Sequence, residues 1–150
     1  MVPEINVLKD TVSWFQRAVP KPSDKHLHVQ LGVHMEEFAE LLQEIFSKDV
    51  TTACMLSAAK EAVKELANHL KKEQGVIAFP DRVAALDAIC DGQVTGAGLA
   101  HMLNMDVVGG LQEVNRSNES KFVDGQPIFD AQGKIKKGPN YQPPCLKPFV

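Results

Sequence analysis

Apolar side chains recur every three or four residues through most of the first 119 positions, a pattern that predicts helices. The alternation of apolar and polar residues that marks a half-buried strand is not found over a useful length. We therefore expect an all-α protein, a bundle of four or five helices. The predicted helices span residues 4–17, 26–47, 52–74, 81–103 and 106–119.

Turn and capping residues mark the ends of these helices. The prolines of the 18–25 loop favour extended backbone, and Ser23 or Asp24 is expected to cap the helix that follows. A threonine is expected to cap the third helix, which should end near Gly75. Glycine and proline are frequent after the last helix, which predicts an irregular tail or lid over residues 120–150.

Length and composition favour one intracellular domain spanning residues 1–150. A formal net charge of −3 gives no electrostatic reason to expect nucleic-acid binding. The three cysteines are odd in number and lack metal-ligand spacing, so reduced thiols in a cytoplasm fit best. No apolar run approaches the roughly 20 residues of a membrane span, and the N-terminus does not read as a signal peptide.

The segment HMEEFAELLQEI, residues 34–45, carries four glutamates and no lysine or arginine. A helix advances about 100° per residue, so all four fall in one arc of about 100°, opposite the apolar side. Like charges four residues apart repel each other by a few tenths of a kcal/mol, and a bound cation would relieve that repulsion. A solvated acidic face is the alternative interpretation. The glutamates are Glu36, Glu37, Glu40 and Glu44.

The fourth predicted helix supplies a second acidic group. Asp87 and Asp91 are the only charged residues between Val83 and Met105, and they lie on one face about 40° apart. The rest of that face is apolar, so two unpaired carboxylates there are expected to be poorly solvated. A hydrogen bond between helices, to His69 or to an arginine, is the alternative to a metal site.

If the two acidic helices face each other, their carboxylates form a cluster of oxygen ligands. Hard oxygen ligands favour Mg²⁺ or Mn²⁺ over zinc, and five carboxylates suffice for two or more ions. Paired ions about 3.5–4 Å apart clamp phosphate oxygens and activate a bound water. The candidate metal ligands are Glu36, Glu37, Glu40, Asp87 and Asp91.

The C-terminal third offers side chains suited to binding phosphate. Three of them follow one another at three-residue spacing near the end of the fifth predicted helix, and others lie in GKIKKGPNY, residues 133–141. Lysines bind a diphosphate as compact point charges, whereas the asparagines can equally cap the helix. The selected candidates are Asn115, Asn118, Lys121, Lys137 and Tyr141.

Three further cations of this region are less specific candidates for binding phosphate. Arg116 lies beside the asparagines, and Lys134 and Lys136 belong to the same tail segment as Lys137. A run of charges is usually a solvated surface, and that interpretation stays open for Lys134 and Lys136.

Three motifs in this order resemble the MazG-like branch of the all-α nucleoside triphosphate pyrophosphohydrolases, phage members in particular. They are EEFAE at 36–40, DAICD at 87–91, and the tail NRSNESKF with GKIKKGPNY. The resemblance covers roughly residues 10–145. The family's second motif is commonly ExxD, but Ala84 and Ala88 stand where its glutamate is expected. By this resemblance, Asp91 corresponds to the aspartate of the motif, and Asp87 is inferred to stand in for the missing glutamate.

The resemblance implies Mg²⁺-dependent cleavage of a nucleoside triphosphate to the monophosphate and pyrophosphate. A metal-held water would attack phosphorus, and one glutamate of the cluster, Glu36, Glu37 or Glu40, would orient or deprotonate it. The resemblance further implies a homodimer or a dimer of dimers, with active sites near the subunit contacts. A phage-encoded member would act in the host cytoplasm.

The nucleobase is expected near the first helix. Trp14 and Phe15 are candidates to stack on it, and Gln30 and His34 to form hydrogen bonds with it. A core role for the two aromatic residues and a surface position for His34 are the alternatives. A purine deoxynucleotide such as dGTP is favoured; dUTP and phosphoribosyl-ATP are alternatives within the fold. A non-enzymatic helical module, an oligomeric scaffold that binds a partner through its acidic face, is the alternative from another class.

Overall fold

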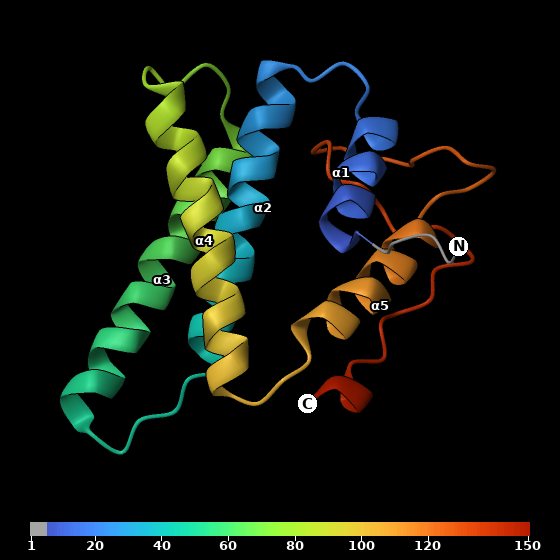
Figure 1. The fold of residues 1–150 in the computed structure, drawn as a ribbon. Coiled ribbons are helices and arrows are strands. Elements are labelled where there is room, and N and C mark those ends of the chain that lie inside the picture. Colours follow the sequence, from blue (N-terminus) through green and yellow to red (C-terminus); the bar gives the residue numbers. More distant parts are fainter. Residues whose placement is uncertain (1–5) are drawn as a thin grey trace. The chain divides into compact units, whose positions relative to one another are not determined.

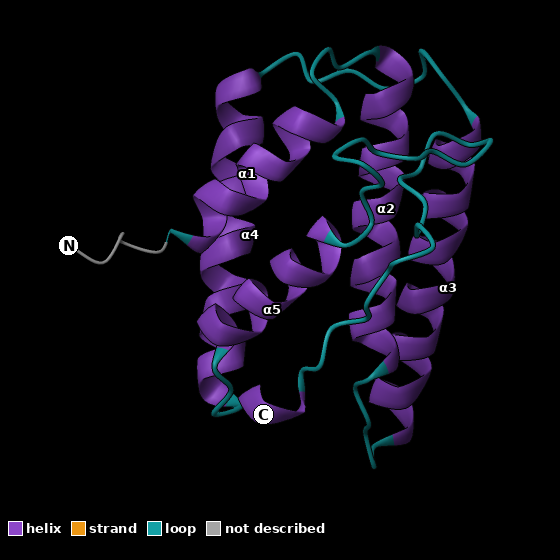
Figure 2. Cartoon of the chain, turned by 90° about the vertical axis from the view of Figure 1, so that its right-hand side faces the viewer, coloured by secondary structure: helices purple, strands orange, loops and turns teal. Residues whose placement is uncertain are grey.

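The computed structural model describes residues 6–150, and positions 4 and 5 of the first predicted helix lie outside the described residues. The prediction of an all-α protein is confirmed: residues 6–150 contain five α-helices and no strand (Figures 1 and 2). The nearest approach to a strand in this range is an isolated bridge between Val123 and Gln126. The helices are α1 Val7–Ala18, α2 Asp24–Gln43, α3 Val50–Lys72, α4 Arg82–Met102 and α5 Val107–Glu119, followed by the short 3₁₀ helix η1 Lys147–Phe149.

Side-chain caps determine where the helices begin. Ser23 caps α2, as the sequence predicts, and Asp81 and Asp106 cap α4 and α5. The prediction of a threonine cap for α3 is wrong, because the cap is Asp49, whose carboxylate accepts a 2.7 Å hydrogen bond from the amide of Thr52. An aspartate one position before the helix reaches that amide directly, so the threonines become part of the first turn.

The chain divides into two compact units, each built from separate segments. The α2–α3 unit comprises Lys21–Ala78 and Phe129–Lys134. The α1–α4–α5 unit comprises Met1–Pro20, Phe79–Ile128 and Ile135–Val150. Each unit is described below by itself, and the expectation of a single domain stays a prediction.

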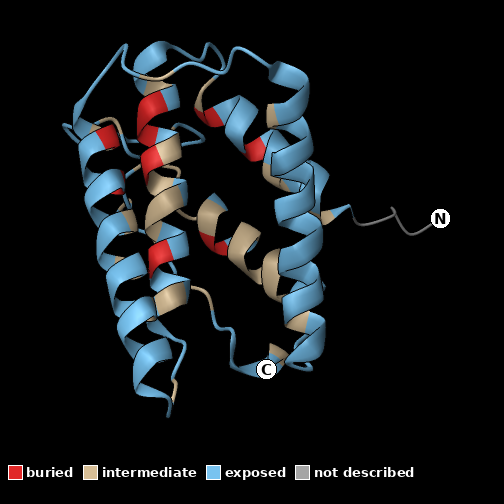
Figure 3. Cartoon of the chain, turned by 90° about the vertical axis from the view of Figure 1, so that its left-hand side faces the viewer, coloured by how far each residue is buried: buried red, intermediate tan, exposed pale blue. Residues whose placement is uncertain are grey.

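In the α2–α3 unit, two long helices run side by side and approach most closely at Gly32 (Figure 1). A β-carbon on this glycine would lie 2.6 Å from Cγ of Lys71 and 2.8 Å from the carbonyl oxygen of Ala67. Only glycine permits this contact without moving α3. The buried residues of the two helices are His28, Val29, Gly32, Ala39, Ala67 and Leu70 (Figure 3).

A fully buried histidine joins the loop after α3 to the first turn of α2. Nδ1 of His28 lies 2.9 Å from the carbonyl oxygen of Asp24, and its Nε2 lies 3.2 Å from the amide nitrogen of Val76. Because the amide of Val76 donates to Nε2, Nδ1 is the ring nitrogen that donates to the carbonyl oxygen of Asp24. The carboxylate of Asp24 accepts a second loop amide, that of Gly75, at 2.7 Å.

In the α1–α4–α5 unit, α1 packs against α5 and the segment that follows it. Trp14 is 7% exposed, and its Nε1 donates to the carbonyl oxygen of Asn118 at 3.1 Å. Arg17 forms two hydrogen bonds with the carboxylate of Glu119, at 2.6 and 2.8 Å. The other buried residues of α1 and α5 are Ala18 and Ser117.

Apolar side chains occur on every side of α4, yet no residue of this helix is buried (Figure 3). Its large apolar side chains are between 44% and 81% exposed. A helix of this composition normally lies within a protein interior. The residues concerned are Val83, Leu86, Ile89, Val94, Leu99 and Met102. Within residues 6–150, no helix is long and apolar enough to span a membrane.

Candidate functional site

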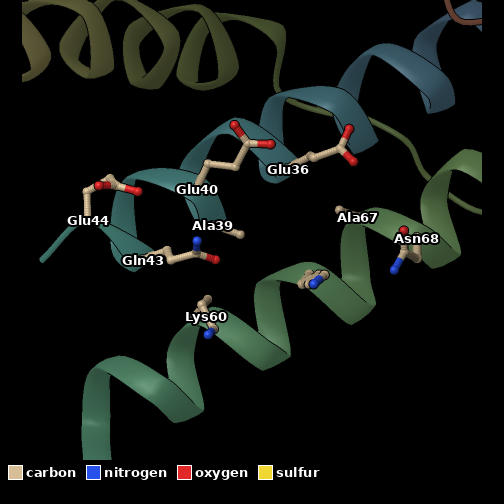
Figure 4. Close-up of a pocket in the computed structure, with 9 residues that line it drawn as sticks. Glu36, Ala39, Glu40, Gln43, Glu44, Lys60, Ala67 and Asn68 are labelled. Carbon is tan, nitrogen blue, oxygen red and sulfur yellow. The ribbon is translucent and has the colours of Figure 1, made fainter. Parts of the chain in front are cut away.

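The four glutamates of α2, called the acidic face below, lie in the α2–α3 unit. Three of them, Glu36, Glu40 and Glu44, follow one another along one side of α2 and line a groove of about 260 Å³ against α3 (Figure 4). The α3 side of the groove carries Lys60 and Lys64. The rest of the lining consists of Ala39, Gln43, Ala67 and Asn68.

Two lysines bind the carboxylate of Glu36. Nζ of Lys71 lies 3.0 Å from Oε1, and Nζ of Lys134 lies 3.0 Å from Oε2. Partial burial works to raise the pKa of Glu36, but the hydrogen bonds from the two lysines outweigh burial, and the pKa lies below its ordinary value. Glu36 is therefore ionised and neutralised by the protein's own cations.

The other three carboxylates of the acidic face have no such partner. Glu37, Glu40 and Glu44 are exposed, and no hydrogen bond or ion pair within residues 6–150 involves their side chains. Their spacing of three and four residues places oxygen atoms on successive turns of one helix. Solvated carboxylates suit a hard divalent cation such as Mg²⁺ or Mn²⁺, because such cations prefer oxygen ligands to sulfur or nitrogen.

Within either unit, no three histidine, cysteine, aspartate or glutamate side chains of the described chain converge on one point. A divalent ion on the acidic face would therefore take few protein oxygens and complete its shell with water or phosphate oxygens. Mg²⁺ is commonly bound in this way, through one or two carboxylates and a substrate phosphate.

Asp87 and Asp91 lie on α4, in the other unit. Both are exposed, and within the described residues neither carboxylate has a hydrogen bond or an ion pair. The expectation that they are poorly solvated is therefore not met, because no residue of α4 is buried. Oγ1 of Thr95 donates a hydrogen bond to the backbone carbonyl of Asp91 and not to its carboxylate.

Of the phosphate-binding candidates, Asn115 is fully engaged in packing. Its Oδ1 accepts from Oγ1 of Thr11 at 2.9 Å, and its Nδ2 donates to the carbonyl oxygen of Val7 at 3.0 Å. Both ends of the amide therefore join α5 to α1. Asn118 also serves this contact, through its backbone carbonyl.

The aromatic candidate Trp14 is part of the core of its unit. The ring of Phe122 stacks on it at 5.5 Å between centroids, and the ring of Phe15 meets it in a T-shaped arrangement at 5.0 Å between centroids. Lys121 places Nζ 5.9 Å from the ring centroid. In this arrangement Trp14 is not open to a nucleobase, and the core role is the one its contacts support. Phe15 is 37% exposed.

The remaining candidates lie at the surface. Gln30 and His34 are exposed on α2, one turn apart. Lys137 lies over the ring of Tyr141, with 4.7 Å from Nζ to the centroid. Lys136 is exposed.

Sequence reasoning missed the lysines of α3 that face the acidic side of α2. Lys60, Lys64 and Lys71 belong to AKEAVKELANHLKKE, whose interleaved charges are typical of an ordinary amphipathic helix. The available signal was their spacing of four and seven residues, which places them on one side of α3. Nothing local indicates that this side faces the glutamates of α2.

Comparison of the chain with known proteins finds no matching family model, no matching curated protein and no matching solved structure.

Proposed function

We propose that the chain is a Mg²⁺-dependent pyrophosphohydrolase that converts a nucleoside triphosphate, with a purine deoxynucleotide such as dGTP favoured, to the monophosphate and pyrophosphate. The observation that carries the proposal is the groove of the α2–α3 unit. There the unpaired carboxylates of Glu40 and Glu44 lie opposite Lys60 and Lys64. Carboxylates suit a divalent cation, and ammonium groups suit the phosphates that accompany it.

The proposed roles follow from charge and exposure. Glu37 and Glu40 are the first candidates to hold the cation, because both are exposed and unpaired among the described residues. Lys64, whose ammonium has no ion-pair partner in this part of the chain, would offset negative charge on the leaving pyrophosphate. Mg²⁺ when bound supplies Lewis-acid activation of water and phosphate. Asp87 and Asp91 remain candidate ligands within their own unit, since neither carboxylate has a partner among residues 6–150.

Self-association belongs to the same proposal. Six large apolar side chains are exposed on α4, and apolar area of this extent is normally covered by protein. A second copy of this chain is the occupant that we propose, in a homodimer or homotetramer. Light scattering coupled to size exclusion would then give a mass of two or four times 16.5 kDa.

The exposed surface of α4 also favours a second candidate function, a non-enzymatic module that binds a helical partner. This alternative predicts neither dependence on Mg²⁺ nor loss of function on changing the glutamates of α2.

Pyrophosphate release from the eight common nucleoside triphosphates, with and without Mg²⁺, tests the enzyme directly. We expect release from at least one substrate, only with Mg²⁺ or Mn²⁺ present. Glu40→Gln should abolish most of this activity with an unchanged circular dichroism spectrum, because it removes a ligand charge and keeps the side-chain shape. Glu73→Gln is the matched control: it makes the same change on an exposed residue outside the groove and should leave the activity unaltered.

Absence of release from all eight nucleotides under both metals would contradict the proposal. Wild-type activity in Glu40→Gln would show that the acidic face is a solvated surface with no part in catalysis.

A further inference from the structure

Residues 142–150, called the tail segment below, lie along α5 and run in the opposite direction to the helix (Figure 1). In the last turn of α5, Oγ of the buried Ser117 donates a 2.8 Å hydrogen bond to the carbonyl oxygen of Gln142. At the start of α5, the amide of Asp106 donates to the carbonyl oxygen of Phe149 at 2.9 Å. The tail segment therefore follows α5 from one end to the other.

The helix and its C-cap bind backbone atoms of the tail segment. The amide of Gln142 donates to Oγ of Ser120 at 2.8 Å, and the amide of Cys145 donates to Oε1 of Glu113 at 2.8 Å. Arg116 holds the carboxylate of Glu113 in place with two hydrogen bonds of 2.7 Å. Hydrogen bonds to the main chain, combined with pockets for a few side chains, are how surfaces bind extended peptides.

One aromatic side chain anchors the tail segment at the start of α5. The ring of Phe149 lies against Gly109, where a β-carbon would be 2.7 Å from two ring carbons and 2.5 Å from Oδ2 of Asp106. Only glycine lets the ring come this close. The fit at Gly110 is looser, since a β-carbon there would lie 3.9 Å from Cδ2 of Leu146 and 4.0 Å from Cβ of Phe149.

The contacts of the tail segment are confined to this one helix. Within residues 6–150, every hydrogen bond between the tail segment and the rest of the chain goes to α5 or to the residues that cap it. The segment can therefore leave α5 without breaking a hydrogen bond to any other helix. Gly138 and Pro139 belong to the irregular connection that precedes it.

We propose that α5 is a binding site for the tail segment of a second copy of this chain, so that two copies associate by exchanging residues 142–150. The second copy carries the same segment and the same surface, so every contact that forms within one chain can form between two. Exchange of an identical element is a low-cost route to a dimer, because no new contact has to be created. The proposal concerns α5 and uses neither the metal nor the acidic face of α2.

A fluorescent peptide of residues 141–150, added to the full chain, tests the site by anisotropy. The chain's own tail segment competes with the peptide, so the apparent affinity depends on the fraction of sites that is free. Phe149→Ala in the chain removes the anchor and should raise the affinity for the peptide about tenfold over the wild type. Lys147→Ala is the matched control, because this exposed side chain has no hydrogen bond or ion pair within residues 6–150. Its affinity should equal that of the wild type.

Substitutions in α5 separate this site from unspecific binding of an apolar peptide. Added to the Phe149→Ala chain, Gly109→Ala should weaken peptide binding about tenfold, because its methyl group takes the space of the ring. Gly110→Ala should leave binding unchanged, because its β-carbon lies at ordinary contact distance. Circular dichroism confirms that each variant is folded. No binding to the Phe149→Ala chain, or equal binding to the two glycine variants, would overturn the site.

Isotope labelling tests the exchange in the wild-type chain, without any substitution. Nitrogen-15-labelled and unlabelled chains are mixed in urea, refolded together and cross-linked through a photo-reactive maleimide on the exposed Cys145. We expect cross-links from Cys145 to α5 that join a labelled peptide to an unlabelled one. Cross-links within single copies alone would overturn the exchange, and the proposed enzyme would stand in either case.

Discussion

The indole ring of Trp14 lies nearly parallel to the ring of Phe122, with 5.5 Å between centroids and 21° between planes. Offset stacking of this kind contributes about 0.5–1.5 kcal/mol beyond the burial of the two rings. Because Trp14 also donates to the carbonyl of Asn118, it ties α1 to the end of α5. Trp14 therefore links α1 both to α5 and to the segment that follows it.

Replacing Trp14 by phenylalanine should lower the free energy of unfolding by about 1–3 kcal/mol, since the carbonyl of Asn118 loses its buried donor. The Michaelis constant for the nucleotide should stay unchanged. Urea unfolding followed by circular dichroism measures the first quantity. Phe15→Leu, at a position 37% exposed, should cost less than Trp14→Phe. A raised Michaelis constant with unchanged stability would restore the base-stacking role.

Substitution by alanine at Gly32 and at Gly96 should change the free energy of unfolding in opposite directions. A β-carbon at Gly32 meets Lys71 and Ala67 at under 3 Å, so Gly32→Ala should destabilise the chain by about 1–3 kcal/mol. A β-carbon at Gly96 meets nothing within 4 Å, so Gly96→Ala should stabilise α4 by about 0.5–1 kcal/mol. The comparison is made by urea unfolding. Equal effects of both substitutions would contradict the close approach of α2 and α3.

Glu113 should make stability depend on pH in acid. Hydrogen bonds from Arg116, and then from the amide of Cys145, lower the pKa of Glu113 from its ordinary value of 4.5 to about 2. The unfolded chain therefore binds the proton first as pH falls. The stabilisation is complete above pH 4.5 and is lost as pH falls toward about 2.

The melting temperatures of the wild type and of Glu113→Gln, followed from about pH 7 to pH 2, test this sign. The wild type should melt higher at neutral pH, and the two curves should converge in acid. Added salt should narrow the difference, because the ion pair lies at the surface. A gap that widens as pH falls would show that the folded chain does not depress this pKa.

The side chain of Asp91 should affect the melting temperature only when metal is present. Its carboxylate is exposed and has no partner in residues 6–150, so Asp91→Asn should leave the melting temperature of the metal-free protein unchanged. Mg²⁺ at a hundredfold excess over its dissociation constant should stabilise the wild type by about 2.7 kcal/mol. Asp91→Asn should remove most of that gain, whereas Glu73→Gln should keep it. Scanning calorimetry at several Mg²⁺ concentrations is the measurement, and an undiminished gain in Asp91→Asn would place the metal elsewhere.

The sequence by itself determined the helices of this protein. The 3.6-residue periodicity and the capping residues are local signals, because a helix forms its backbone hydrogen bonds four residues apart. All five starts lie within three residues of their expected positions, and α2 ends four residues early at Gln43. The threonine predicted to cap α3 was wrong because Asp49 lies close by and also suits the role, so local sequence did not distinguish them.

Only the tertiary structure decided which candidate side chains are free and which are engaged. Periodicity placed Glu36 and Glu40 on the same side of a helix, yet Glu36 is paired with Lys71 and Lys134 and Glu40 is not. The side-chain amide of Asn115 likewise forms hydrogen bonds with α1, more than 100 residues earlier in the chain. The physical reason is range: a residue's helical face depends on its neighbours within one turn, whereas its partners depend on which distant segments pack against that face.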